Sequence, residues 1–93
     1  MTIRELSELG GRVYVHLATA ELGDRFMRHA EAEGFTFADG AKPTEREPAE
    51  VMAINHDGTI NYVGAVGMMA YGAPAATIGG EPLIRVEYGE LPE

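Results

Sequence analysis

The feature that most constrains the fold is a pair of short apolar segments joined by His-Asp-Gly at residues 56–58. A glycine that closes a short polar turn is typical of a β-hairpin whose loop needs a left-handed residue. A loop of these three residues places Ile54 opposite Ile60. Met52 then lies opposite Tyr62, so one face of the hairpin is apolar. A two-residue loop would mix apolar and polar side chains on each face, and the sequence therefore predicts the three-residue loop.

An amphipathic helix is predicted between Thr19 and Glu33. Thr19 is a typical N-cap residue, and Gly34 offers the left-handed conformation in which helices commonly end. The apolar stripe consists of Leu22, Phe26, Met27 and Ala30, and the side chains expected mostly to face solvent are Asp24, Arg25, Arg28, Glu31 and Glu33. Gly23 disfavours the helix by roughly 1 kcal/mol relative to alanine, which indicates close packing against a neighbour.

The remaining elements are predicted from shorter patterns. A short helix is expected at residues 2–9, because Thr2 and Glu5 have the spacing of a capping box. Alternating or glycine-bracketed apolar residues predict strands at 12–17, 35–38, 68–71 and 83–88, and an exposed loop is expected at 41–48. The predicted fold class is α+β: a mostly antiparallel β-sheet with one main helix packed on one face and a short N-terminal helix. Residues 1–93 are expected to form a single domain.

Few side chains in the sequence are suited to catalysis. There is no cysteine, and Ser7 is the one serine. The histidines at positions 16, 29 and 56 come from different predicted elements and lack the spacing of a zinc site. The glycines of GAVGMMAYG lack the Lys-Ser/Thr pair that follows a phosphate-binding loop. We therefore expect a protein that is not an enzyme, with no catalytic residue, metal or cofactor.

The negative net charge of the chain argues against a protein that binds nucleic acid directly. Seven lysines and arginines stand against fifteen acids, which gives a net charge of −8. Phosphate backbones are bound by the opposite charge, so a direct nucleic-acid partner is not expected. The first residues, MTIRELSELGG, carry acids where a secretory signal has a basic start, and no apolar stretch approaches membrane-spanning length. We expect a cytoplasmic protein, without a membrane partner, that forms a homo-oligomer to bury more surface.

Candidate ligand-binding residues are the exposed cations and the groups that can accompany them. Arg85 is expected to project from the sheet face opposite Ile84 and Val86, and the second group of cations lies in the segment DGAKPTER. Tyrosines can stack on a planar ring, arginines can hold phosphate, and asparagines can bind polar edges. The candidate residues are Arg85, Lys42, Arg46, Tyr62, Tyr71, Asn61 and Thr44, with Tyr14 and Asn55 as further contributors. Each of them also has a purely structural interpretation, as an ion-pair partner or a cover for the core.

Four segments, GFTFADGAKPT, VMAINHDGTINYVG, GMMAYG and IRVEY, resemble small uncharacterised proteins encoded by phages and prophages of Firmicutes. The resemblance extends over roughly residues 12–88. It implies a role in counteracting bacterial antiphage defence, in the cytoplasm of a bacterial host. Some small phage proteins of this kind sequester the nucleotide signals of systems such as CBASS or Thoeris, and others are anti-CRISPR proteins.

The sequence therefore leaves three candidate functions. The first is sequestration of a nucleotide-derived immune signal, which requires cations gathered locally in an acidic chain. The second is inhibition of a host defence nuclease, with the acidic protein occupying a basic groove in the manner of an anti-CRISPR protein. The third is a plain protein-interaction module. The partner is thus expected to be either a nucleotide-derived small molecule or a host defence protein.

Overall fold

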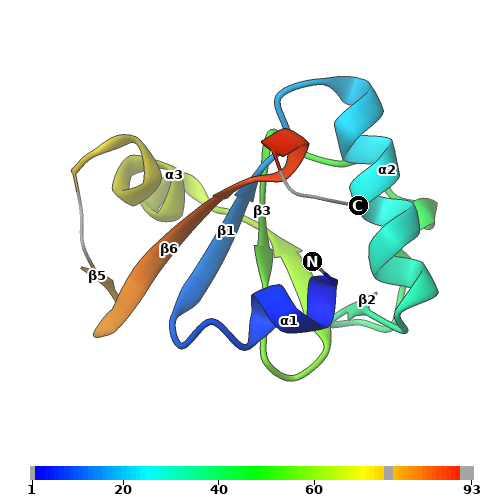
Figure 1. Ribbon diagram of the computed structural model, residues 1–93, viewed down its shortest axis with the longest axis horizontal. Coiled ribbons are helices and arrows are strands. Elements are labelled where there is room, and N and C mark those ends of the chain that lie inside the picture. Colours follow the sequence, from blue (N-terminus) through cyan, green and yellow to red (C-terminus); the bar gives the residue numbers. More distant parts are fainter. Residues whose placement is uncertain (1, 75–76, 91–93) are drawn as a thin grey trace.

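The computed structural model describes residues 2–74 and 77–90 (Figure 1). In chain order the elements are α1 (Ile3–Ser7), β1 (Arg12–His16), α2 (Ala20–Ala32), β2 (Thr36–Phe37), the 3₁₀ helix η1 (Pro43–Glu45), β3 (Val51–Ile54), β4 (Thr59–Tyr62), α3 (Ala65–Gly72), β5 (Thr77–Ile78), β6 (Glu81–Glu87) and the 3₁₀ helix η2 (Tyr88–Glu90). The strands form one sheet in the order β2-β4-β3-β1-β6-β5.

The α+β class is confirmed, but the sheet is mixed and not mostly antiparallel. β1 pairs antiparallel with β3, as do β3 with β4 and β5 with β6. The pairs β1–β6 and β2–β4 are parallel. Hairpins made of adjacent segments are antiparallel by necessity, whereas β6 returns from the far end of the chain to lie beside β1. That long-range pairing is invisible in the local pattern, which explains the error in the prediction.

A second correction concerns the segment predicted as a strand at residues 68–71, which lies within helix α3. A short apolar run has no period that separates a strand from a buried helix. Gly67 has no side chain, and this allows α3 to lie close to the sheet. A Cβ atom at Gly67 would lie 2.5 Å from Cγ1 of Val63 and 3.0 Å from the hydroxyl oxygen of Tyr14. Only a residue without a side chain lets the helix approach this closely.

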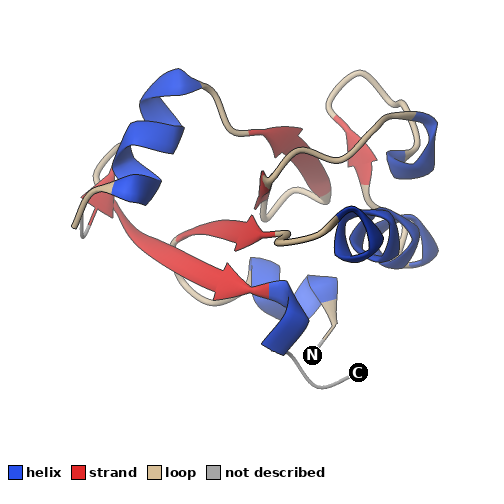
Figure 2. Cartoon of the chain, turned by 90° about the horizontal axis from the view of Figure 1, so that it is seen from above, coloured by secondary structure: helices blue, strands red, loops and turns tan. Residues whose placement is uncertain are grey.

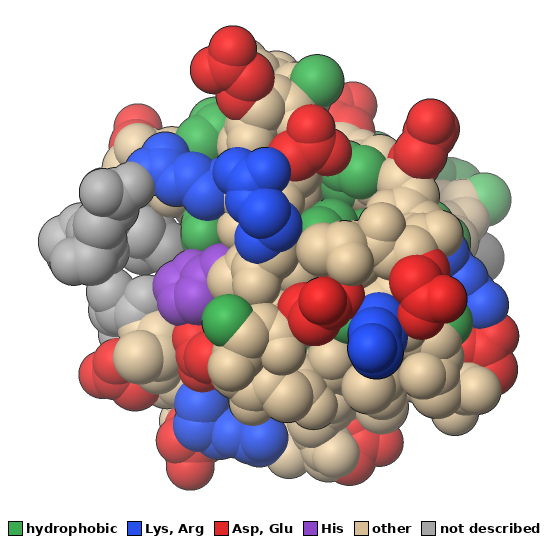
Figure 3. Space-filling view, turned by 90° about the vertical axis from the view of Figure 1, so that its right-hand side faces the viewer, with side chains coloured by type: hydrophobic (Ala, Val, Ile, Leu, Met, Phe, Trp, Pro, Cys, Tyr) green, Lys and Arg blue, Asp and Glu red, His purple; other side chains and the backbone are tan. Residues whose placement is uncertain are grey.

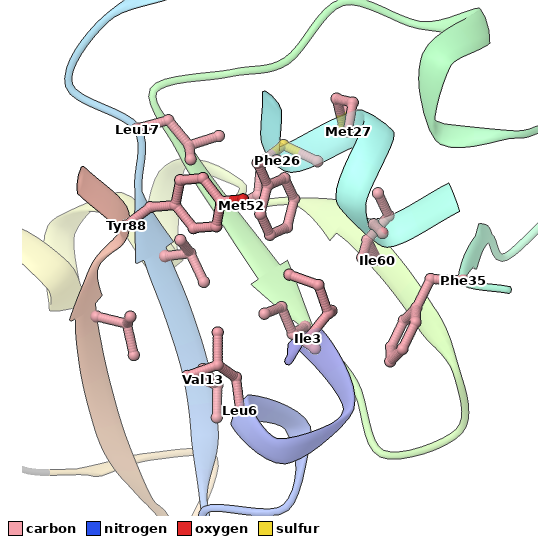
Figure 4. Close-up of a cluster of buried hydrophobic side chains, with 14 of the residues drawn as sticks. Ile3, Leu6, Val13, Leu17, Phe26, Met27, Phe35, Met52, Ile60 and Tyr88 are labelled. Carbon is pink, nitrogen blue, oxygen red and sulfur yellow. The ribbon is translucent and has the colours of Figure 1, made fainter. Parts of the chain in front are cut away.

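The two faces of the sheet are covered by different helices, with α2 on one side and α3 on the other (Figures 1 and 2). The main core lies on the α2 side, where α1 also contributes, and several of its side chains are shown in Figure 4. Its largest fully buried side chains include Phe26, Phe35, Ile3, Leu6 and Met27. A smaller core on the α3 side contains Tyr14, Val51, Ala53 and Leu83. The predicted helix on one face is thus confirmed, and the second helix on the other face was not predicted.

The hairpin prediction is confirmed in its register. Ile54 pairs with Ile60, and Met52 pairs with Tyr62. Gly58 has a φ of +89°, the left-handed conformation that the three-residue loop requires.

The predicted helix ends are also confirmed. The Thr19 hydroxyl oxygen accepts a hydrogen bond from the Leu22 amide at 3.2 Å, and Gly34 has a φ of +84°. A Cβ atom at Gly23 would lie 2.6 Å from Cγ of Pro48, so close packing at this glycine is confirmed. The capping box of Thr2 and Glu5 is present at the start of α1.

Candidate functional site

The structure divides the predicted binding residues between the two sides of the sheet. Arg85 and Tyr71 lie on the α3 side, where Tyr71 packs against the smaller core. Lys42, Thr44 and Arg46 lie in and around η1, beside α2. No single site therefore contains all the predicted residues, and each group is described in turn.

Arg85 holds the end of helix α3. Its guanidinium donates hydrogen bonds to the carbonyl oxygens of Tyr71 at 3.1 Å, Ala70 at 3.0 Å and Ala73 at 2.7 Å. Terminal carbonyls of a helix lack partners within the helix, and a cation is also favoured by the helix dipole there. The guanidinium carbon lies 5.7 Å from the centroid of the Tyr71 ring. Arg85 therefore has a structural role: its hydrogen bonds connect strand β6 to the end of helix α3.

The loop around η1 is fastened to α2 by hydrogen bonds from Thr44. The Thr44 hydroxyl donates to Oε1 of Glu31 at 2.6 Å, and its amide donates to the same oxygen at 3.2 Å. These bonds stabilise the ionised carboxylate and lower the pKa of Glu31. The Lys42 amide donates to Oε1 of Glu45 at 2.9 Å, which closes the turn at its start.

Arg46 forms an ion pair with Asp39 at the other end of the loop. The hydrogen bond from Arg46 is the main cause of a lowered pKa at Asp39. The guanidinium carbon of Arg46 also lies 4.6 Å from the centroid of the Phe37 ring. The Phe37 ring is in turn 5.4 Å from the ring of Tyr62, which is 44% exposed. Arg46 thus lies over the Phe37 ring, and Tyr62 packs against that ring at a tilt of 40°, at the edge of the sheet.

A shallow hollow lies between α2 and this loop, and we call it the α2 hollow. It has a volume of about 200 Å³ and is lined by Asp24, Met27, Arg28, Thr44 and Arg46. A second hollow of about 360 Å³ shares two of its lining residues, Asp24 and Arg28. Two arginines and a threonine around one concavity can hold a phosphate or carboxylate group.

The two hollows are lined by three of the seven cations of the chain, namely Arg25, Arg28 and Arg46. Carboxylates lie among them, as the interleaved red and blue side chains in Figure 3 show. Two acids, Glu21 and Asp24, line the same hollows, so the cations here exceed the acids by one in a protein of net charge −8.

Arg25 and Arg28 were missed as site residues, because the sequence places them only on the outer face of a helix. Their spacing of three residues puts them on neighbouring positions of one helix face, a signal that was present. The spacing does not show which loop lies beside this outer face of α2.

The asparagine pair predicted to bind polar edges lies on the hairpin. Nδ2 of Asn55 donates to Oδ1 of Asn61 at 2.8 Å, and Nδ2 of Asn61 donates to the carbonyl of Tyr62 at 2.9 Å. Asn61 pairs across the sheet with Ala53, whose side chain belongs to the α3-side core. Asn61 therefore points away from the α2 hollow.

A histidine–carboxylate cluster stands where the parallel strands β1 and β6 end. Nδ1 of His16 lies 2.7 and 2.9 Å from the two carboxylate oxygens of Glu87, and Nε2 lies 3.3 Å from Oε1 of Glu50. The hydrogen bond to Glu87 is the main cause of a raised pKa at His16. The imidazole is 6.1 Å from the ring of Tyr71, so the cluster borders the last turn of α3. It stabilises a charged histidine and connects β1, β6 and α3.

Within residues 2–74 and 77–90, no three His, Asp or Glu side chains come together in a way that could hold a metal ion. None of the helices in these ranges combines the length and apolarity needed to cross a membrane. Comparisons of the chain with protein-family models, curated proteins and solved structures gave no significant match.

Proposed function

We propose that the protein is a non-enzymatic binding protein of phage type that sequesters a nucleotide-derived immune signal at the α2 hollow. The observation that carries the proposal is the convergence of Arg28, Thr44 and Arg46 on one concavity. Nucleotide-derived signals carry phosphate, and arginine recognises phosphate through paired hydrogen bonds. Arg46 and Thr44, which the sequence identified as candidate residues, are joined here by Arg28, which it did not identify.

The neighbouring rings support a ligand that has a base as well as a phosphate. Arg46 lines the α2 hollow and also lies over the ring of Phe37, which packs against the ring of Tyr62. The exposed part of Tyr62 offers a planar surface on which a base can stack. A phosphate in the hollow would compete with Asp39 for Arg46 and would lie near Asp24, so the ligand must supply stacking energy beyond charge.

Thermal unfolding in the presence of signalling nucleotides tests the proposal. A ligand at a hundredfold excess over its dissociation constant stabilises the folded state by about 2.7 kcal/mol. For a chain of this size, each kcal/mol raises the melting temperature by roughly 4–8 °C, so the shift is easily measured. No shift with any cyclic or ADP-ribose-derived nucleotide would refute a sponge for these signals.

The variant Arg28→Ala with Arg46→Ala should remove most of the shift. Arg12→Ala is the matched control, because Arg12 is also an exposed arginine in an ion pair, 3.0 Å from Glu81, but lies outside the α2 hollow. A shift retained by the double variant would discard the α2 hollow as the site while leaving nucleotide binding itself standing.

The second candidate function is an acidic inhibitor that occupies a basic groove of a defence nuclease. The observation that favours it is the balance of charge: three of seven cations line the two hollows, which leaves four cations against thirteen of the fifteen acids for the rest of the chain. Excess protein should then block cleavage by a guide-loaded nuclease, and added salt should weaken the block. Cleavage that is unaffected across several nucleases would count against this function.

A further inference from the structure

The second hollow on the outer face of α2 continues the α2 hollow, and we call it the outer hollow. It has a volume of about 360 Å³ and is lined by Glu21, Leu22, Asp24, Arg25 and Arg28. Asp24 and Arg28 also line the α2 hollow, so the two concavities adjoin at these side chains. The α2 hollow alone, at about 200 Å³, is smaller than the roughly 300 Å³ at which small-molecule sites begin. The outer hollow is the adjoining space into which a bound nucleotide can extend.

The outer hollow is unsuited to a second phosphate. Glu21 lies four residues before Arg25, a spacing at which two side chains of a helix are neighbours. Asp24 is placed in the same way before Arg28. A phosphate bound to either arginine from this side would therefore also lie near a carboxylate, and like charges repel. The part of the ligand in the outer hollow should thus be uncharged.

The carboxylates of the outer hollow are suited to sugar hydroxyls. An ionised carboxylate only accepts hydrogen bonds, and its two oxygens can accept from two neighbouring hydroxyls. Aspartate or glutamate holds ribose in this way in dinucleotide-binding folds. Glu21 and Asp24 are both exposed, so a ligand can reach them. Leu22 adds a half-buried apolar side chain beside them, held by η2, since a Cβ atom at Gly89 would lie 3.0 Å from Cδ1 of Leu22.

We propose that the two hollows together bind a nucleoside diphosphate that carries a terminal sugar with two neighbouring hydroxyls. The diphosphate would lie against Arg28, Thr44 and Arg46 in the α2 hollow. The sugar hydroxyls would donate hydrogen bonds to Asp24 and Glu21 in the outer hollow. This inference rests on the proposed function and narrows it, because a cyclic dinucleotide has both sugars closed into its ring and presents no terminal sugar.

ADP-ribose and ADP are the probes, because they share the diphosphate and differ in the terminal ribose. Calorimetric titration should show that ADP-ribose binds the wild type at least about tenfold more tightly than ADP, since it gains hydrogen bonds to charged acceptors. The variant Asp24→Ala separates this effect from charge. Loss of a carboxylate beside a phosphate should leave ADP binding unchanged or make it tighter. ADP-ribose should instead bind the variant at least about fivefold more weakly, because its hydroxyls lose an acceptor.

Glu8→Gln is the matched control, because Glu8 is an exposed acid at the end of α1 and lines neither hollow. It should leave both affinities unchanged, and circular dichroism should show that both variants are folded.

Three results would overturn the inference and leave nucleotide binding at the α2 hollow standing. ADP-ribose could bind no more tightly than ADP, Asp24→Ala could tighten the binding of ADP-ribose as it does that of ADP, or cyclic di-AMP could bind the wild type more tightly than ADP-ribose. If none of these three nucleotides binds the wild type, the inference and the proposed function are both wrong.

Discussion

Replacing Glu33 should weaken the attachment of helix α1 to the end of α2. Glu33 is the C-cap residue of α2, and its carboxylate accepts hydrogen bonds from the amides of Ile3 at 2.7 Å and Arg4 at 2.9 Å. These amides are in the first turn of α1, where they have no partner within the helix. Nε2 of His29 is 2.8 Å from the same carboxylate, whose side chain is only 20% exposed. One carboxylate therefore connects α1 to the end of α2.

The stability lost on replacing Glu33 depends on how well water can replace each of its hydrogen bonds. The Ile3 amide is part-buried, so losing its acceptor should cost about 1–2 kcal/mol. The Arg4 amide is exposed, and water can restore most of that bond, which leaves roughly 0.5 kcal/mol. The pair with His29 adds about 0.5 kcal/mol, as is usual for a pair on one helix. Glu33→Ala should thus reduce the free energy of unfolding by about 2–3 kcal/mol, and Glu33→Gln by about half as much because one oxygen remains.

Urea denaturation followed by circular dichroism measures this change. With a slope of about 1 kcal/mol per molar urea for a small domain, the midpoint of Glu33→Ala should fall by roughly 2–3 M. Glu8→Ala is the control, because Glu8 is an exposed acid at the end of α1 and should shift the midpoint by less than about 0.5 M. Equal midpoints for Glu33→Ala and the wild type would refute the reasoning and mean that α1 is held by the burial of Ile3 and Leu6 alone.

Two further predictions concern the attachment of α3 and the histidine cluster. Gly67→Ala should lower the free energy of unfolding by about 1–3 kcal/mol in the same urea assay, because the new methyl group would lie 2.5 Å from Cγ1 of Val63. An unchanged midpoint would mean that α3 can move away from the sheet without loss of stability. The raised pKa of His16 means that the folded state binds its proton more tightly than the unfolded state. The stability from its contact with Glu87 is therefore fully present below about pH 6.5 and is lost as pH rises through the higher folded pKa. Unfolding free energies measured across this range should show that loss in the wild type and little of it in His16→Asn.

Features that depend on neighbouring residues could be predicted from the sequence. The register of the hairpin follows from which positions must share the apolar face, and Gly58 supplies the conformation that its loop needs. The start and end of α2 follow from Thr19 and Gly34, whose effects are confined to one turn of helix. The expectation that Gly23 marks a close approach was confirmed as well, although the partner, Pro48, could not be named.

The arrangement of the candidate site needed the tertiary structure. Thr44 and Arg46 were recognised as exposed polar residues, but Arg28 became their neighbour only because the η1 loop folds onto the outer face of α2. Arg85 was taken as a ligand-binding residue, and the structure instead directs it to the carbonyls that end α3. An arginine's donors bind whichever acceptors the fold brings near, and a linear pattern does not contain that information.

The sequence by itself determined the hairpin, the main helix and the short N-terminal helix, because caps, turns and alternating faces act over a few residues. Only the tertiary structure decided that β6 returns beside β1 in parallel and that residues 65–72 form a helix on the second face of the sheet. Both outcomes depend on which surfaces remain uncovered after the local elements have formed. The apolar run around Met68 and Met69 fits a strand or a helix equally well, and in the folded protein it is a helix that packs closely against Tyr14 and Val63 at Gly67.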